Sequence, residues 1–255
     1  DYGNYDDVRI ECNKKNIGLL RSRNRGAEIA SGDVVAFIDD DAIADQKWVE
    51  ELVSVYNQHD VLAAGGKMTP AWVAGDPSYL PEEFYWLVGV THRGVADGPG
   101  EVRNTFGSNI SFDRETFLNL DGFESNVGGR KGDANLQGGE TELCARLRSE
   151  YGSGVYYNPD AEVAHKVFAY RTDPLWLLNR AFWQGYSKRG MQVLVPESTT
   201  EEYDFLGQLL TESIPQRVHE TVLNPSLWKV LQLGMLFSLI TSVGFGFLYG
   251  IIRWR

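Results

Sequence analysis

One apolar run that ends in three carboxylates constrains this chain more than any other feature. Residues Val34 to Ile38 are all apolar, and Asp39, Asp40 and Asp41 follow them without a break. Such a run predicts a buried strand of a parallel sheet, and open α/β sheets bind ligands beyond the carboxyl ends of their strands. Three adjacent anions repel one another, so they persist where they cap a helix, face solvent or share a cation. The run therefore predicts an α/β domain with a cation site at one sheet edge.

Size and charge limit the classes of function. The chain has 255 residues, 43% of them apolar and 23% charged, which suffices for a full α/β core. Its formal net charge of −11 leaves no basic stripe, and this argues against nucleic acid as a partner. Cys12 and Cys144 have no zinc-type spacing and make no disulfide framework. We expect one catalytic domain with an appendage, two reduced thiols and no nucleic-acid partner.

Apolar spacing predicts alternating helices and strands in the first two thirds of the chain. Helices are expected over residues 18–30, 46–56, 82–87, 114–119 and 140–151, and strands over residues 34–38, 61–66, 109–112 and 155–158. The first helix has Asn16 as its expected N-cap, and the last strand is expected at the sheet edge. Only the short stretch from Val8 to Ile10 precedes these elements as a strand. We therefore expect that a β-α unit of the domain is missing upstream.

The C-terminal part has a different pattern. Residues 171–226 show helical patterns rich in Trp, Leu and Phe, and no charged residue lies between Val230 and Ile252. As a helix the latter stretch would be ~35 Å long, enough to cross a hydrocarbon core of about 30 Å. Trp228, Lys229 and Arg253 flank it as interfacial anchors would. We expect a transmembrane helix here, and an amphipathic hairpin lying in the membrane interface is the alternative.

A series of short motifs follows the order found in one enzyme family. The first group precedes and includes the acidic run: Asn13, Asn16, Gly18, Arg23, Asn24, Gly26, Ser31-Gly32-Asp33 and Phe37-Ile38-Asp39-Asp40-Asp41. The second group lies downstream: Gly107-x-Asn109-Ile110-Ser111-Phe112-x-Arg114, Gly122-Phe123 and Gly138-Gly139-Glu140-Thr141-Glu142-Leu143. The ordered set, over residues 8–165, resembles the family 2 glycosyltransferases with the GT-A fold.

Three longer stretches narrow this resemblance. Residues 82–89, 101–109 and 182–187 resemble the haloarchaeal glucosyl-dolichyl phosphate glucuronosyltransferases. The resemblance implies a metal-dependent, inverting hexosyltransferase that moves glucuronic acid from a UDP-sugar to a dolichyl-phosphate-linked glycan in protein N-glycosylation. It also implies a location at the cell membrane, with the catalytic domain on the cytoplasmic side, where nucleotide sugars are found.

The expected organisation has three parts. A GT-A catalytic domain, Rossmann-like and doubly wound but without its first β-α unit, occupies residues 1–170. A helical membrane-proximal region follows over residues 171–226, and the transmembrane segment covers residues 227–255.

Two departures from the family pattern bear on activity. The family's opening strand, which carries part of the uridine pocket, is absent from this sequence. The usual Glu-Asp pair before the acceptor helix is here Gly139-Glu140. A catalytically inactive binding or scaffold subunit is therefore the alternative from another class of function. A soluble nucleotidyltransferase is a third alternative, although no phosphate-cradling glycine loop precedes the first helix.

The acidic run is the expected site of Mg²⁺ or Mn²⁺. Asp39 and Asp41 are alternate residues just past a strand, with Asp41 on the metal and Asp39 nearer the ribose or the metal's waters. Capping the next helix would need one carboxylate and not three. The resemblance adds His165, expected after a strand over residues 161–164, as a third ligand to metal or diphosphate, with a structural role as the alternative.

Basic and amide side chains are the expected donor contacts. Arg23 and Asn24 are expected in the nucleotide pocket together with Asp39 and Asp40. Arg171 and Arg180 are expected to meet the diphosphate, because a guanidinium group binds two phosphate oxygens at once. Contact with lipid headgroups is the alternative for these two arginines.

Glu140 is the expected general base. Inverting transfer is an in-line displacement, which needs a base on the face opposite the leaving group. Glu140 begins a helix after the glycine-rich loop of residues 128–139, and the family alignment gives it the base position that usually holds Asp. Glu142, two residues further on, shares both the base assignment and the alternative of an ordinary acid at a helix N-terminus.

Overall fold

A computed structural model describes residues 8–96, 98–125, 127, 129–131, 134–194 and 205–254. Residues 1–7 of the expected catalytic domain, residues 195–204 of the expected helical region and residue 255 of the expected transmembrane segment lie outside the described residues. So do residues 128, 132 and 133 of the expected glycine-rich loop.

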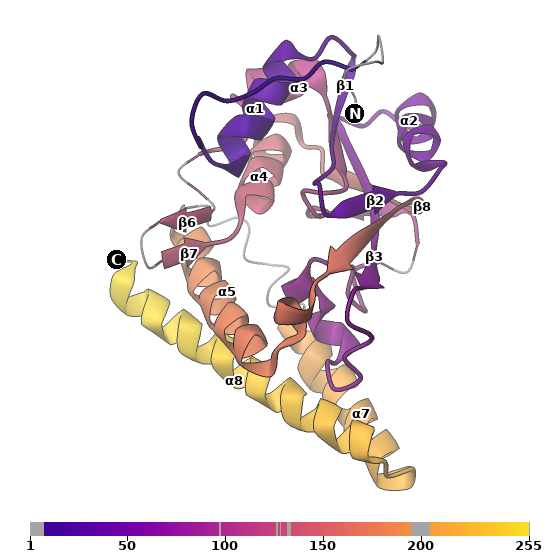
Figure 1. The fold of residues 1–255 in the computed structure, drawn as a ribbon, viewed down its shortest axis with the longest axis vertical. Helices are drawn as coiled ribbons and strands as arrows, with labels where there is room; N and C mark the ends of the chain where they lie inside the picture. Colours follow the sequence, from indigo (N-terminus) through magenta and orange to yellow (C-terminus); the bar gives the residue numbers. More distant parts are fainter. Residues whose placement is uncertain are drawn as a thin grey trace.

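A mixed sheet forms the centre of the fold (Figure 1). Its spatial order is β1 (Val34–Phe37), β5 (Ile110–Asp113), β3 (Ala63–Trp72), β8 (Val155–Val167) and β2 (Ala42–Ala44), with β4 (Gly100–Val102) also paired to β8. Strands β3 and β8 are parallel, and the other pairs are antiparallel. A separate small hairpin joins β6 (Gly129–Lys131) and β7 (Ala134–Leu136).

Helices cover both faces of this sheet. Helices α1 (Leu19–Ile29), α3 (Arg114–Asn119) and α4 (Gly139–Tyr151) share one buried core with β1 and β5, and α2 (Trp48–Gln58) packs on the other face with β3 and β8. The first core contains four phenylalanines, each with its ring centroid 5.4 Å from another: Phe37, Phe112, Phe117 and Phe123. The predicted α/β class is therefore confirmed, and the helices expected here are found within two residues of their predicted limits.

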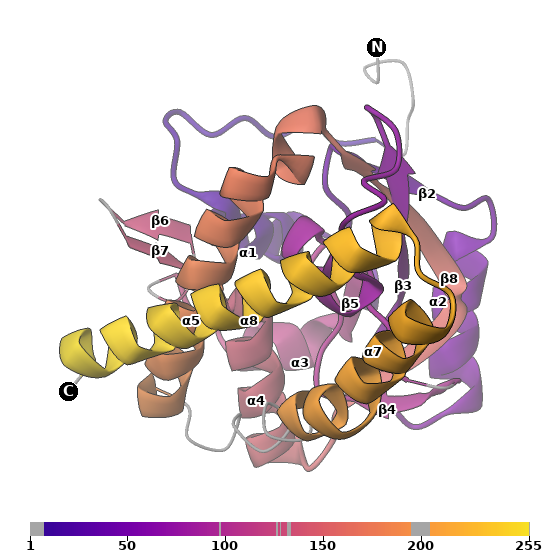
Figure 2. The same cartoon turned by 90° about the horizontal axis from the view of Figure 1, so that it is seen from below.

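A second, helical layer lies beneath the sheet. It consists of η2 (Glu82–Val88), η3 (Ala169–Thr172), α5 (Pro174–Leu194), η5 (Leu209–Ser213), α7 (Ile214–Leu223) and α8 (Leu227–Arg253). Figures 1 and 2 show α8 running along α5 across the base of the molecule. Glycines allow this close approach: a Cβ on Gly246 would lie 1.8 Å from the Phe182 carbonyl oxygen, and one on Gly185 would lie 1.9 Å from that of Val243.

Four local predictions are wrong in detail, two of them in the first elements of the chain and two around β8. Strand β1 pairs with antiparallel β5 and leaves Ala36 exposed, so it is not the buried parallel strand that its apolar run predicted. The run cannot reveal that β5, far away in sequence, inserts between β1 and β3. The first helix begins after Gly18, at φ 88°, rather than at an Asn16 cap, although Asn16 Oδ1 accepts a hydrogen bond from the Gly18 N–H at 2.9 Å.

The predicted edge strand at residues 155–158 is instead the first part of the 13-residue strand β8. This strand is central, because it pairs with β3, β2 and β4. A register shift between Gly66 and Met68 of β3 accommodates extra residues in β8, and the strand continues through Pro159. His165 therefore lies inside a strand and not after one.

We predict that Gly246→Ala lowers the thermal unfolding midpoint of the full chain, because its methyl group would clash with the α5 backbone and force the helices apart by overpacking worth about 1–3 kcal/mol. Gly234→Ala on the same helix is the matched control. Nothing lies within 4 Å of a Cβ there, so the higher helix propensity of alanine should leave the midpoint unchanged or raise it. Equal midpoints for the two variants would contradict the observed α5–α8 contact.

Candidate active site

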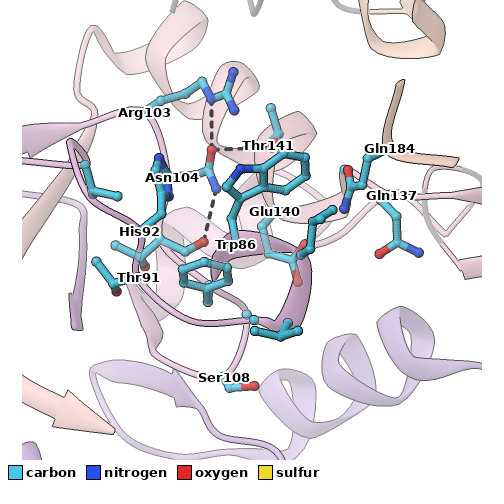
Figure 3. A pocket seen from close by; sticks show the side chains of 18 of the residues that line it. Trp86, Thr91, His92, Arg103, Asn104, Ser108, Gln137, Glu140, Thr141 and Gln184 are labelled. Carbon is cyan, nitrogen blue, oxygen red and sulfur yellow. Dashed lines mark hydrogen bonds between the residues drawn. The ribbon is translucent and has the colours of Figure 1, made fainter. Parts of the chain in front are cut away.

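One large cavity lies between the sheet and the helical layer. It has a volume of about 1300 Å³. Its lining residues come mainly from the stretches 19–108 and 137–165 and from α5. Asp39 and Asp41 enter it from the end of β1, Glu140 from the start of α4, and His165 from β8. Figure 3 shows Ser108, Glu140, Thr141 and Gln184 around the same space. The fold therefore brings together carboxylates that lie about a hundred residues apart in sequence.

Arg23 joins two of these carboxylates. Its Nη2 donates to Asp39 Oδ1 at 2.7 Å, and its Nη1 donates to Glu140 Oε1 at 2.9 Å. The guanidinium is 8% exposed and lies over the ring of Phe123, 5.7 Å from the centroid. Gly107 covers this pair closely, since a Cβ there would lie 2.1 Å from Glu140 Oε1. A buried arginine thus fixes the distance between the acidic run and the N-terminus of α4.

The environment of Asp39 keeps it ionised. Burial by itself would raise the pKa of Asp39, but the charge of Arg23 and the hydrogen bond from Ser108 outweigh burial and hold that pKa below its ordinary value. Ser108 Oγ donates to Asp39 Oδ2 at 2.5 Å. Both carboxylate oxygens of Asp39 therefore already accept hydrogen bonds from side chains of the cavity.

Asp41 belongs to a second cluster, with His165 and Arg171. Arg171 Nη2 donates to Asp41 Oδ2 at 3.0 Å, and its Nη1 lies 3.0 Å from His165 Nε2. His165 Nε2 is itself 3.4 Å from Asp41 Oδ2. Burial and the neighbouring Arg171 lower the pKa of His165 despite the opposing effect of Asp41. The imidazole is therefore neutral near pH 7, the state in which it can accept a hydrogen bond or bind a metal.

The donor set fits a divalent cation that is completed by substrate. No group of three or more His, Cys, Asp or Glu side chains in the described part of the chain is arranged to hold a metal on its own. Asp41 and His165 nevertheless face one point, which the guanidinium of Arg171 takes in this structure. Mg²⁺ commonly takes one or two carboxylates and fills its other positions with phosphate oxygens and water. This pair of residues suits such a cation, with Asp39 nearby in the same cavity.

The two glutamates at the start of α4 have different roles in the structure. Glu142 is buried and forms a bidentate pair with Arg146, at 2.6 Å and 2.8 Å. Arg146 also donates to the carbonyl oxygens of Leu120 and, at 2.7 Å, Gly122, so the pair anchors α4 to the end of α3. Glu142 does not line the cavity, whereas Glu140 does. Of the two, Glu140 alone is placed to contact a substrate in the cavity.

The predicted donor contacts divide into cavity residues and structural ones. Asn24 exchanges two hydrogen bonds with the backbone of Phe123, at 2.8 Å and 2.9 Å, and does not line the cavity. Asp40 is exposed and also lies outside the lining. Arg180 lines it, donates to Gln137 Oε1 at 3.0 Å, and has a buried Nε without a hydrogen-bond partner among the described residues. Burial and the nearby Arg171 lower the pKa of Arg180, so this cation lacks sufficient compensating charge.

Sequence reasoning missed several polar residues of the cavity wall. Arg103 donates to Asn104 Oδ1 at 3.0 Å, and Thr141 Oγ1 donates to the same oxygen at 3.3 Å, as Figure 3 shows. Ser108 was part of a recognised motif, but its bond to Asp39 was not foreseen. The only signal for Ser108 was a small polar residue directly before the buried Asn109-Ile110 stretch. Asn109 itself is structural, because its side chain bonds the Trp48 indole and two backbone carbonyls.

Comparisons with known proteins identify relatives of the whole chain. Residues 1–120 match the profile of the family described as glycosyl transferase family 2. The chain is 47% identical over 253 residues to the glucosyl-dolichyl phosphate glucuronosyltransferase of Haloferax volcanii, covering 99% of this chain and 80% of that protein. It is 28% identical over 152 residues to a putative polypeptide N-acetylgalactosaminyltransferase 13 of Drosophila melanogaster, covering 53% of this chain and 25% of that protein.

Solved structures give weaker matches. The mannosyltransferase PcManGT of Pyrobaculum calidifontis, in complex with GDP-Man and Mn²⁺, is 14% identical with a TM-score of 0.49, and 92% of this chain and 68% of that chain are covered. GalNAc-T7 with UDP, GalNAc and Mn²⁺ is 17% identical with a TM-score of 0.46, and 76% of this chain and 41% of that chain are covered.

We predict that Glu142→Gln destabilises the fold, whereas Glu140→Gln does not. Glutamine at position 142 would remove the buried carboxylate that pairs with half-buried Arg146, at a cost on the order of 2 kcal/mol in the free energy of unfolding. Glu140 is 26% exposed and Arg23 keeps Asp39 as a partner, so that substitution should cost less than about 1 kcal/mol. Denaturant unfolding of both variants measures the difference, and equal losses would show that the assigned roles are wrong.

Proposed function

The chain belongs to glycosyl transferase family 2, and from that premise we propose that it transfers glucuronic acid from UDP to a dolichyl-phosphate-linked glycan, with inversion at the anomeric carbon. The relative from Haloferax volcanii, 47% identical over nearly the whole chain, supports the acceptor and the sugar by its name. UDP as the carrier is the nucleotide that the resemblance implies. The observation that carries the proposal is the single cavity in which Asp39, Asp41 and Glu140 meet the cations Arg171 and Arg180.

The acidic run and the arginines are the proposed diphosphate site. Asp41 and His165, with Asp39 beside them, would hold Mg²⁺ or Mn²⁺, which supplies positive charge to the departing diphosphate. Arg171 would then exchange its contact with Asp41 for one with phosphate oxygens. Arg180 would satisfy its buried Nε on the same anion. Each of these contacts would stabilise the negative charge that develops on the diphosphate as its bond to the sugar breaks.

Glu140 is the proposed general base. It lines the cavity at the N-terminus of α4, where Arg23 holds it in a fixed position relative to Asp39. It would take the proton of the attacking acceptor hydroxyl while the diphosphate leaves on the opposite face of the sugar. The altered acidic pair that suggested an inactive scaffold subunit therefore still provides a carboxylate at this point.

Membrane association through α8 is part of the proposal. This helix is long and apolar enough to cross a membrane, by length and composition. A dolichyl-linked acceptor is confined to the membrane, and nucleotide sugars are cytoplasmic, so the catalytic domain should face the cytoplasm.

We predict that transfer requires a divalent cation and that Asp41→Asn lowers turnover by ~10²-fold, because the amide removes a negative ligand but keeps the shape. Transfer assays across a Mn²⁺ titration, with and without chelator, measure this effect. Asp60→Asn, an exposed carboxylate outside the cavity, is the matched control and should keep full turnover. Transfer at an undiminished rate in excess chelator would refute the metal site.

We predict that Glu140→Gln lowers kcat by ~10²-fold or more while donor binding stays nearly unchanged, because glutamine keeps the shape and removes basicity. Single-turnover transfer and a separate donor-binding titration give the two quantities. Glu142→Gln, assayed at a temperature where it remains folded, should keep most of its kcat. If the Glu142 variant loses turnover and the Glu140 variant keeps it, the base assignment moves to Glu142.

A further inference from the structure

Helix α8 has an exposed apolar face along its whole length. Seven of its aliphatic and phenylalanine side chains are between 42% and 68% exposed: Val230, Leu231, Phe237, Phe245, Leu248, Ile251 and Ile252. We call them the α8 stripe. Their spacing places them on one side of the helix. The stripe contains no charged side chain.

The hydroxyl groups beside the stripe donate hydrogen bonds to backbone carbonyl oxygens within α8. Ser238 Oγ donates to the Gly234 carbonyl oxygen at 2.8 Å, and Thr241 Oγ1 donates to that of Phe237 at 2.8 Å. An apolar solvent can therefore cover this face without leaving a hydroxyl donor unpaired. At the two ends of the helix, exposed Trp228 and Arg253 are side chains suited to the boundary between lipid and water.

The opposite face of α8 is fixed to the catalytic domain. Arg217 on α7 donates to buried Glu83 of η2 at 2.7 Å and to Gln232 of α8 at 2.9 Å. Gln232 Nε2 in turn donates to the Ser78 carbonyl oxygen at 2.7 Å. Releasing α8 would expose an apolar core and break the hydrogen bonds that Gln232 makes with Arg217 and Ser78, which is strongly unfavourable. The helix is therefore part of the domain and not an anchor on a free tether.

This attachment conflicts with a simple crossing of the bilayer. Helix α5 lies against α8, and it also forms a wall of the cavity with Arg180 and Lys188. A perpendicular α8 would draw α5, its cations and the cavity into the hydrocarbon core, where charged groups are costly. With α8 parallel to the membrane, the stripe meets lipid and the cavity stays in water.

We propose that α8 lies parallel to the membrane surface. The α8 stripe enters one leaflet, and both ends of the helix stay on the side of the membrane that holds the catalytic domain. The occupant of the stripe is thus a lipid surface. The proposal deepens the membrane association of the proposed function, and it places the α5 wall of the cavity next to the leaflet that would hold a lipid-linked acceptor. It does not depend on the transfer reaction itself.

A thiol-labelling experiment on the full chain tests the orientation. Cys12 is exposed on the catalytic domain, and Cys144 is buried and should not react. Sealed inside-out membrane vesicles carrying either the native chain or a Cys12→Ser, Arg253→Cys variant are treated with a membrane-impermeant maleimide, before and after detergent. We expect both exposed thiols to be labelled to the same extent before detergent. Labelling of Cys12 alone, with the second thiol reached only after detergent, would establish a transmembrane helix and overturn the proposal.

A second experiment tests the occupant of the stripe. Phe237→Lys combined with Phe245→Lys should lower binding to phosphatidylcholine–phosphatidylglycerol vesicles by roughly 10-fold or more, because two large apolar side chains no longer enter lipid. Val49→Lys combined with Val53→Lys adds the same charge on exposed positions of α2, at the far end of the molecule from α8 (Figure 1), and should not weaken binding.

Unchanged vesicle binding by the Phe237 and Phe245 variant would overturn the proposal. If that variant also changed from a dimer to a monomer, the stripe would be an interface between two copies of the chain. Neither experiment measures sugar transfer, so a chain that binds lipid as expected but transfers no sugar would refute only the proposed reaction.

Discussion

The two hydrogen bonds of Arg23 are the contact on which the site depends. One joins this buried guanidinium to Asp39 at the end of β1, and the other joins it to Glu140 at the start of α4. Asp39 belongs to the part of the site that would bind the sugar donor. Glu140 belongs to the part that would receive the acceptor. A cation between two carboxylates offsets their repulsion and fixes their separation at the same time. In-line displacement needs such a fixed separation, because the leaving group and the base act on opposite faces of one sugar.

The charge of the chain is negative overall, but its cavity is not. Arg171 neutralises Asp41, and nearby Arg180 has a buried Nε that finds no hydrogen-bond partner in the part of the chain that the structure describes. In a low-dielectric cavity these cations attract an anion more strongly than exposed ones would. A net charge of −11 therefore says little about the charge that a ligand meets, because the surface carboxylates are screened by solvent.

Helix α5 connects the chemistry to the base of the molecule. On one side it supplies Arg180 to the cavity, and on the other Gly185 lets the backbone of α8 pack against it. Within the same layer, the ion pair between Glu83 and Arg217 joins α7 to η2, which ends beside His165. The surface proposed to meet lipid and the cavity proposed to bind the sugar donor are thus two sides of one closely packed layer.

Local sequence patterns by themselves determined the helices, the α/β class and the acidic run of the site, because periodicity, capping and charge repulsion act over a few residues. Only the tertiary structure decided which residues face the cavity. In the structure Glu142 pairs with Arg146, and Asn24 forms hydrogen bonds with the backbone of Phe123, whereas Glu140 lines the cavity. The tertiary structure also extended β8 past Pro159 into the middle of the sheet, where His165 meets Asp41. These outcomes depend on partners distant in sequence, and a single sequence does not state which distant side chain satisfies a buried charge or which strand lies beside another.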